Sequence, residues 1–304
     1  LGSNHTGSWV SAEDGYPAIA DVLNLNGQGA GIPEIVLTGN KKVSLYNAVP
    51  DAQNRCVEIN SISNNPLDDP IIGPQSSAIH SDCDESRPSF GGQPTIADFN
   101  GDGKREIGVA GACWYTIYAV DQNDGMLSIY AMNPTRDWSS ASTGSTVFDF
   151  DGDGKSEVVF SDEDALYVWG IDTNNGLDPW ERFIDYLVDQ NHKSWTIHEY
   201  PLVADVDGDG KAEILVVNSA RPSHLDKYGI YALGAADDNW VSARQWWNQH
   251  AYYVSNIDND GVVGFAEPNY APFSPVDING FRQQAPGEFG ALAAPNLSLY
   301  ALPA

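Results

Sequence analysis

The sequence predicts an all-β fold made of repeated four-stranded units, and three observations predict it. An acidic loop recurs along the 304 residues. A short apolar strand is expected on each side of every copy, and a third strand with an aliphatic-Tyr pair comes next. No 3.6-residue periodicity runs through the units, which excludes a helical solenoid. Four short strands in a unit of about 50 residues are typical of a β-propeller blade.

The acidic loop has three gapless copies, which begin at Asp98, Asp149 and Asp205. Each reads Asp-x-Asp-Gly-Asp-Gly-Lys-x-Glu, with Asn100 in place of the second Asp of the first copy. A hairpin turn would also use these glycines, but three neighbouring carboxylates repel one another unless a cation lies among them. We therefore interpret the three loops as cation sites.

The spacing of the oxygen-bearing residues follows the logic of the EF-hand calcium loop. Side chains at positions 1, 3 and 5 converge, Gly at position 6 allows the turn, and residue 7 offers its carbonyl. The closing acid comes here at position 9. Calcium accepts six to eight oxygens, whereas zinc would want His or Cys. The predicted Ca²⁺ ligands of these three strong sites are Asp98, Asn100, Asp102, Lys104, Glu106; Asp149, Asp151, Asp153, Lys155, Glu157; Asp205, Asp207, Asp209, Lys211 and Glu213.

Two looser copies of the loop flank the three central ones. The first needs one inserted residue, and the last has its closing acid at position 12. Fewer charged ligands predict weaker calcium binding at both. The candidate ligands are Asp21, Asn24, Asn26 and Glu34 in the first copy, and Asn256, Asp258, Asp260, Val262 and Glu267 in the last.

The blade units are expected at about 17–60, 94–138, 145–195, 201–246 and 252–304, in a single domain of residues 1–304. A Trp-bearing fourth strand is expected at Trp9, Trp138, Trp195 and Trp240. The segment 298–300 is expected to be the third strand of the last unit, with residues 8–11 as its fourth.

The units either close a ring of five or are the last five blades of a larger propeller, because both arrangements leave no exposed edge strand. Irregular stretches at 60–93, 122–144, 171–194 and 262–295 are expected to form loops on the propeller faces.

The acidic loops resemble the FG-GAP and VCBS-type calcium repeats of integrin α-subunit propellers and of many bacterial surface proteins. The resemblance covers roughly residues 9–262. The segment from Arg244 to Gln283 is similar to the last blade of large secreted, multidomain bacterial proteins. The resemblance implies a secreted or surface-displayed protein, bacterial in origin, with a binding role.

Charge and cysteine content restrict the partners and the compartment. A net charge of −27 argues against nucleic acid and anionic membranes. No apolar run is long enough to span a membrane. No signal peptide is visible in the sequence, and Leu1 followed by Gly2-Ser3 is typical of a processed or trimmed start. None of the three cysteines has zinc-site or redox spacing. One disulfide and one free thiol would suit an oxidising compartment. We favour Cys56–Cys83 over other pairings, with three buried thiols as the alternative.

Catalytic motifs are missing: the sequence has no His-Glu-x-x-His pair and no Gly-x-Ser-x-Gly elbow. His250 is expected to be a packed histidine, and Trp246 and Trp247 to be core residues unless they stack on sugars. We therefore predict a non-catalytic, calcium-stabilised extracellular binding, adhesion or scaffold module, with a protein or glycan bound at the propeller faces. Two alternatives are a structural subunit of a filament or surface layer that self-associates through its terminal strands, and a polysaccharide lyase-like enzyme.

Overall fold

The computed structural model describes residues 16–23, 32–39, 41–68, 91–111, 113–137, 143–196, 198–219, 228–254, 257, 261–263, 279–286 and 299–301. Within these residues, the chain forms four antiparallel sheets of four strands each. The helices described are two short 3-10 turns, η1 (Pro66–Asp68) and η2 (Pro179–Glu181). No helix in these ranges is long and apolar enough to cross a bilayer. The predicted all-β fold is confirmed.

Each sheet is a meander in which strand order follows chain order. The first sheet consists of β1 (Pro17–Ala20), β2 (Glu34–Gly39), β3 (Lys42–Asn47) and β4 (Glu58–Ser63). The second consists of β5 (Thr95–Ala97), β6 (Glu106–Gly111), β7 (Trp114–Val120) and β8 (Leu127–Pro134). The third consists of β9 (Ser145–Phe148), β10 (Glu157–Ser161), β11 (Leu166–Ile171) and β12 (Phe183–Asp189). The fourth consists of β13 (Leu202–Ala204), β14 (Glu213–Asn218), β15 (Gly229–Ala235) and β16 (Leu299–Ala301).

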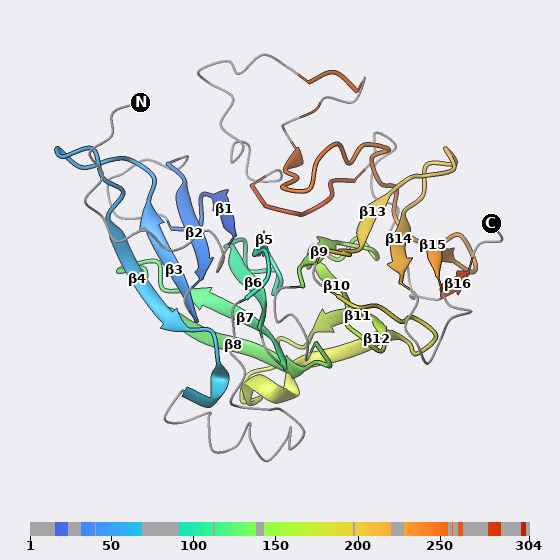
Figure 1. Ribbon diagram of the computed structural model, residues 1–304, viewed down its shortest axis with the longest axis horizontal. Coiled ribbons are helices and arrows are strands. Elements are labelled where there is room, and N and C mark those ends of the chain that lie inside the picture. The colour runs from blue at the N-terminus through green and yellow to red at the C-terminus, as the bar shows by residue number, and fades with distance from the viewer. Residues whose placement is uncertain are drawn as a thin grey trace.

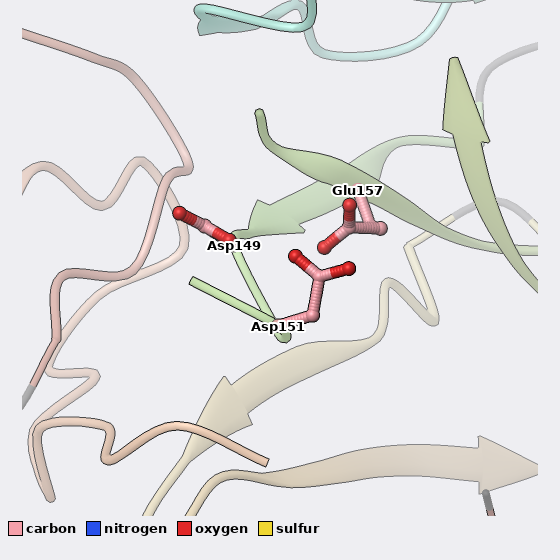
Figure 2. Close-up of side chains that lie close together, drawn as sticks. All are labelled: Asp149, Asp151 and Glu157. Carbon is pink, nitrogen blue, oxygen red and sulfur yellow. The ribbon is translucent and has the colours of Figure 1, made fainter. Parts of the chain in front are cut away.

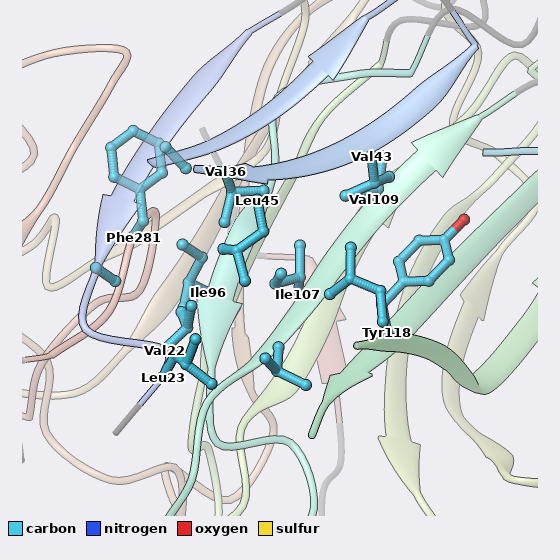
Figure 3. Close-up of a cluster of buried hydrophobic side chains, with 14 residues drawn as sticks. Val22, Leu23, Val36, Val43, Leu45, Ile96, Ile107, Val109, Tyr118 and Phe281 are labelled. Carbon is cyan, nitrogen blue, oxygen red and sulfur yellow. The ribbon is translucent and has the colours of Figure 1, made fainter. Parts of the chain in front are cut away.

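The sheets lie one after another around a common centre, as the blades of a β-propeller do (Figure 1). The four described sheets form an open arc and do not close a ring. Hydrophobic side chains fill the space between neighbouring sheets. Val36 of β2 and Ile107 of β6, for example, belong to the cluster between the first two sheets (Figure 3). Because the second and third sheets are covered on both faces, all residues of β6, β9 and β10 are buried.

The fourth strands differ from the prediction, which is wrong in placing them at the tryptophans. In the first three sheets they are β4, β8 and β12, and the last two run through stretches that we expected to be irregular. Trp195 lies outside any strand and is 46% exposed. Trp240 follows β15 and packs against Phe150, with ring centroids 4.5 Å apart, so it fills the core between two sheets. Trp9 and Trp138 lie outside the described residues.

The aliphatic-Tyr pair near the end of the chain also has a different place. β16 pairs antiparallel with β15, and Tyr300 lies opposite Gly234. The strand β16 is therefore the fourth strand of the fourth sheet and not the third strand of a fifth unit. A physical reason is that β15 would otherwise leave a row of unpaired backbone groups at its edge.

One segment, residues 279–286, contacts all four sheets at the inner strand of each, which is its first strand, or at the residue that follows that strand. Asn279 bonds to the backbone of Asp21 just after β1, and Phe281 bridges Ile96 of β5. Gln283 bridges Val147 of β9. Gln284 Nε2 then donates to the carbonyl of Val203 in β13 at 2.9 Å. The segment thus holds the inner strands of the sheets together.

The favoured disulfide between Cys56 and Cys83 is wrong. Cys56 lies in the connection between β3 and β4, where it is exposed and has a free thiol. Cys113, by contrast, is 1% exposed at the tight turn between β6 and β7 and takes part in a disulfide. Cys83 lies outside the described residues. The chain therefore has a disulfide, but it fixes the turn before β7 and not the connection before β4.

Candidate metal centres

The acidic loops occupy the same place in successive sheets. In each, the lead Asp follows the first strand and the closing Glu opens the second, as in Asp149 after β9 and Glu157 at the start of β10. The antiparallel pairing of these two strands brings the two ends of the loop together, because Phe148 lies directly opposite Glu157. The predicted second strands are therefore confirmed, and each loop is the hairpin that joins them.

The lead Asp organises each loop by accepting backbone N–H groups from the glycines. Asp149 Oδ1 accepts from Gly152 at 2.7 Å, and its Oδ2 accepts from Gly154 at 2.9 Å. Both glycines have positive φ, 75° and 87°, which other residues adopt only at a cost. Asp98 and Asp205 make equivalent bonds in their loops. The glycines at positions 4 and 6 therefore allow the coil that brings the acids together.

The closing Glu bonds back to the residue that follows the lead Asp of its loop. Glu157 Oε2 accepts the N–H of Phe150 at 2.8 Å, and the same bond recurs in all four sheets. The other pairs are Glu34 with Val22, Glu106 with Phe99, and Glu213 with Val206. Even the loose first loop thus keeps this feature.

Burial disfavours the charged form of these glutamates. Burial raises the pKa of Glu106 to about 8, and the pKa of Glu34 and of Glu213 to about 7. The pKa of Glu157 is raised well above its usual range, first by burial and then by the neighbouring aspartates. Carboxylates in such surroundings are stabilised by a cation.

In two loops the carboxylates converge on one point. Oxygens of Asp149, Asp151 and Glu157 all lie within 4.8 Å of one another (Figure 2). The same holds for the second cluster, formed by Asp205, Asp207 and Glu213. The donors are all carboxylate oxygens, which suit a hard cation such as Ca²⁺ or Mg²⁺ and do not suit zinc. These residues therefore fit the calcium ion that the sequence predicts.

The acid at position 5 and the lysine at position 7 interact with each other. Asp153 accepts the backbone N–H of Lys155 at 2.9 Å, and the ammonium of Lys155 also bonds to the same carboxylate. Asp102 and Lys104 are joined in the same two ways, and the backbone N–H of Lys211 bonds to Asp209. Asp153 and Asp209 are not members of the two clusters. The lysines therefore do more than offer a carbonyl, since two of them partly neutralise position 5.

The loop that begins at Asp98 does not form such a cluster among the described residues. Asn100 replaces an acid, and its Nδ2 donates to Glu106 Oε1 at 3.0 Å. Arg105, which is 8% exposed, places its guanidinium 3.8 Å from Asp98 Oδ2 and also donates to the carbonyl of Asn279. A positive guanidinium and a neutral amide of the protein thus contact the acids that a cation would otherwise contact.

The two outer loops are only partly described. Asp21 and Glu34 have the places that the prediction gives them, at the end of β1 and the start of β2. Asn24 and Asn26 lie outside the described residues, as do Asn256, Asp258, Asp260 and Glu267 of the last loop. Val262 is 56% exposed.

Sequence reasoning missed Arg105, Asn279 and Gln245, whose Nε2 donates to Asp205 Oδ2 at 3.1 Å. The position of Arg105 carried a signal, because the matching residues of the other two loops are Ser156 and Ala212. Gln245 and Asn279 had none, because they lie far along the chain from the loops that they contact.

The fold and the loops together define a β-propeller-like protein with repeated acidic hairpins between first and second strands. A family model described as FG-GAP-like repeat matches residues 98–160 and 149–216. The two matches overlap and include all three central loops. This stretch of the chain is therefore similar to FG-GAP-like repeats.

Two solved structures are similar at low identity. The crystal structure of the V. cholerae biofilm matrix protein Bap1 is 18% identical with a TM-score of 0.46, over 84% of this chain and 34% of that one. A protein from Lactobacillus plantarum is 10% identical with a TM-score of 0.38, over 76% of this chain and 55% of that one. The chain thus spans about a third of the first and about half of the second. No curated protein matches the sequence.

Proposed function

We propose that this chain is a calcium-stabilised, non-catalytic binding or scaffold module that works outside the cell. The observation that carries the proposal is the convergence of three carboxylates in each of two loops. One member of each trio is a buried glutamate that opens a core strand. Without a cation these charges repel one another at the hairpin that starts a sheet, so a bound ion would stabilise the sheet itself.

Calcium suits these loops better than magnesium does. Calcium takes six to eight oxygens in a flexible cage, and backbone carbonyls can complete its shell. A loop of nine residues with four acids and a coiled backbone, as in 149–157, can supply many of them. Magnesium holds strict octahedral geometry and keeps several waters. Five ions would bring the formal charge from −27 to −17 if all five loops, including the two outer ones and the loop at Asp98, each bind one ion.

The extracellular location is supported by two features. The acidic loops resemble the FG-GAP repeats of cell-surface and secreted proteins, many of them bacterial. In addition, Cys113 takes part in a disulfide. Disulfides persist chiefly in oxidising compartments such as the cell exterior. The strongly acidic surface agrees with a partner that is neither nucleic acid nor an anionic membrane. The partner that we propose is a protein or a glycan at a propeller face.

Thermal unfolding in calcium and in chelator tests the calcium proposal. At a hundredfold excess over the dissociation constant, one site adds about 2.7 kcal/mol to stability. A chelator should therefore lower the melting temperature strongly, and magnesium should restore it only in part. The Asp151→Asn, Asp207→Asn double variant should lose most of the calcium effect. Asp185→Asn, which removes an exposed acid of β12, is the matched control. An unmoved melting curve in chelator, with no calcium by elemental analysis, would contradict the proposal.

A further inference from the structure

A second candidate site lies beside the inner strand of the fourth sheet. A cavity of about 300 Å³ is lined by Tyr200, Leu202, Trp247, Asn248, Gln249, His250 and Arg282. Its volume is at the lower end of the range for small-ligand pockets. Tyr200 precedes β13 and Asp205 follows it, so the cavity and the acidic loop lie at opposite ends of the same strand.

The cavity contains a buried cation without a carboxylate partner. Arg282 is 1% exposed, and no carboxylate of the described residues lies within 4.0 Å of its guanidinium. It donates to the carbonyls of Ser145, Pro201 and His250 and to the hydroxyl of Thr146. These acceptors satisfy four of its five N–H groups but do not neutralise its charge. One hydrogen of Nη1 has no partner among the described residues.

The backbone and the aromatic rings fix this cation in place. Arg282 has φ 53°, a strained value for a residue with a side chain. Its guanidinium lies over the rings of Tyr200 and Trp247, at 5.0 and 5.2 Å from their centroids. Burial lowers the pKa of Arg282 to about 10, so it stays charged at neutral pH. A chain of net charge −27 thus keeps a fixed positive charge at one cavity, and such a charge attracts an anion.

The open side of the cavity offers neutral hydrogen-bonding groups. The side chains of Asn248 and His250 are exposed and have no hydrogen-bond partner among the described residues. Partial burial, the charge of Arg282 and His198 lower the pKa of His250 to about 4, so its imidazole is neutral near pH 7. Leu202 and the ring of Tyr200 supply an apolar wall.

We propose that this cavity binds a uronic acid residue of an acidic saccharide. The sugar carboxylate would face Arg282, its hydroxyls would bond to Asn248 and His250, and its carbon skeleton would contact Leu202 and Tyr200. An acidic peptide side chain has a carboxylate but no ring hydroxyls for the two unpartnered groups, which is why we favour the sugar. The inference is independent of calcium, because the cavity contains none of the acidic-loop residues.

Glucuronate and glucose form a matched pair of probes, because they differ only at the carboxylate. Binding is measured by ligand-observed NMR on the full chain in saturating calcium, with its melting temperature recorded as a check on folding. We expect glucuronate to bind at least about tenfold more tightly than glucose, and we expect added salt to weaken the binding of glucuronate. Equal binding of the two sugars, or binding of neither, would overturn the proposal.

Two variants locate the site. Asn248→Ala with His250→Ala removes two exposed side chains and should weaken glucuronate at least about fivefold with an unchanged melting temperature. Asn174→Ala, another exposed asparagine, should leave binding unchanged. Arg282→Gln should abolish the preference for glucuronate over glucose; if that variant does not fold, the double variant decides. Undiminished binding by the double variant, or oligoglutamate binding as tightly as glucuronate, would show that the assignment is wrong.

Discussion

The loops 98–106 and 149–157 share one pattern but differ in how their charges are balanced. The first contains three acids and two bases, and the second contains four acids and one base. In the first, Arg105 and the amide of Asn100 contact the carboxylates of Asp98 and Glu106. In the second, no side-chain amide or guanidinium of the described residues bonds to Asp151 or Glu157, and both converge with Asp149. The two loops thus differ at positions 3 and 8. In the first, side chains of the protein balance the acids, and in the second the acids are left suited to an ion.

The largest effect is expected from removing the buried acid of the converging loop. Glu157→Ala deletes a ligand and leaves the N–H of Phe150 without its acceptor. In saturating calcium the cost should be about 3 kcal/mol, which includes the loss of one bound ion. Chemical unfolding measures it. In chelator the cost should shrink, because a buried charge is also removed; an equal cost in both conditions would mean that Glu157 is purely structural.

Exchanging the residues at positions 3 and 8 should exchange the behaviour of the loops. Asn100→Asp with Arg105→Ser should create a tighter site at 98–106, and Asp151→Asn with Ser156→Arg should weaken the site at 149–157. We expect changes of at least about tenfold, or 1.4 kcal/mol, in opposite directions. Calorimetric calcium titration measures both. Changes of the same sign would refute our explanation of the difference.

A smaller and more uniform effect is expected at position 6. Gly103 and Gly154 have φ of 83° and 87°, and a Cβ would meet nothing within 4 Å at either. Alanine at either position should therefore cost only backbone strain, about 1–2 kcal/mol. In chelator the two costs should match. In calcium Gly154→Ala should cost more, because a distorted coil also weakens the ion site. Denaturant unfolding of both variants checks this.

The smallest effect concerns pH and lies outside both loops. His192 is 1% exposed, and burial lowers its pKa to about 4. The unfolded chain binds this proton near pH 6.5 and the folded chain does not, so stability falls as the pH drops through that range. Lowering the pH from 8 to 6 should cost about 1 kcal/mol through His192. His192→Gln should remove that part of the pH dependence and the exposed His198→Gln should not, as measured by unfolding at each pH.

Local patterns allowed much of the fold to be predicted. The glycines at positions 4 and 6 and the closing Glu are near neighbours in sequence, so the coil, the hairpin and the two strands around it follow from short-range rules. The prediction places the fourth strands at the tryptophans and so misses β8 and β12, whereas Trp240 is a core residue between sheets.

Contacts between distant residues could not be predicted. Arg105 and Asn279 are 174 residues apart, and Arg282 contacts Ser145 across 137 residues. No local pattern marks such pairs. They nevertheless position Arg105 beside the acids of loop 98–106 and fix the buried guanidinium of Arg282. Cys56 was mispaired for the same reason, since sequence spacing does not determine disulfide connectivity.

Anomalous diffraction from crystals grown in calcium is the most direct test of the central claim. It locates each ion and its occupancy in one measurement. We predict strong peaks within the clusters of Asp149 and Asp205, each with carboxylate oxygens about 2.3–2.6 Å away, and a weaker peak or none at Asp98. Absence of ions from both clusters, or a strongest peak at Asp98, would contradict the account.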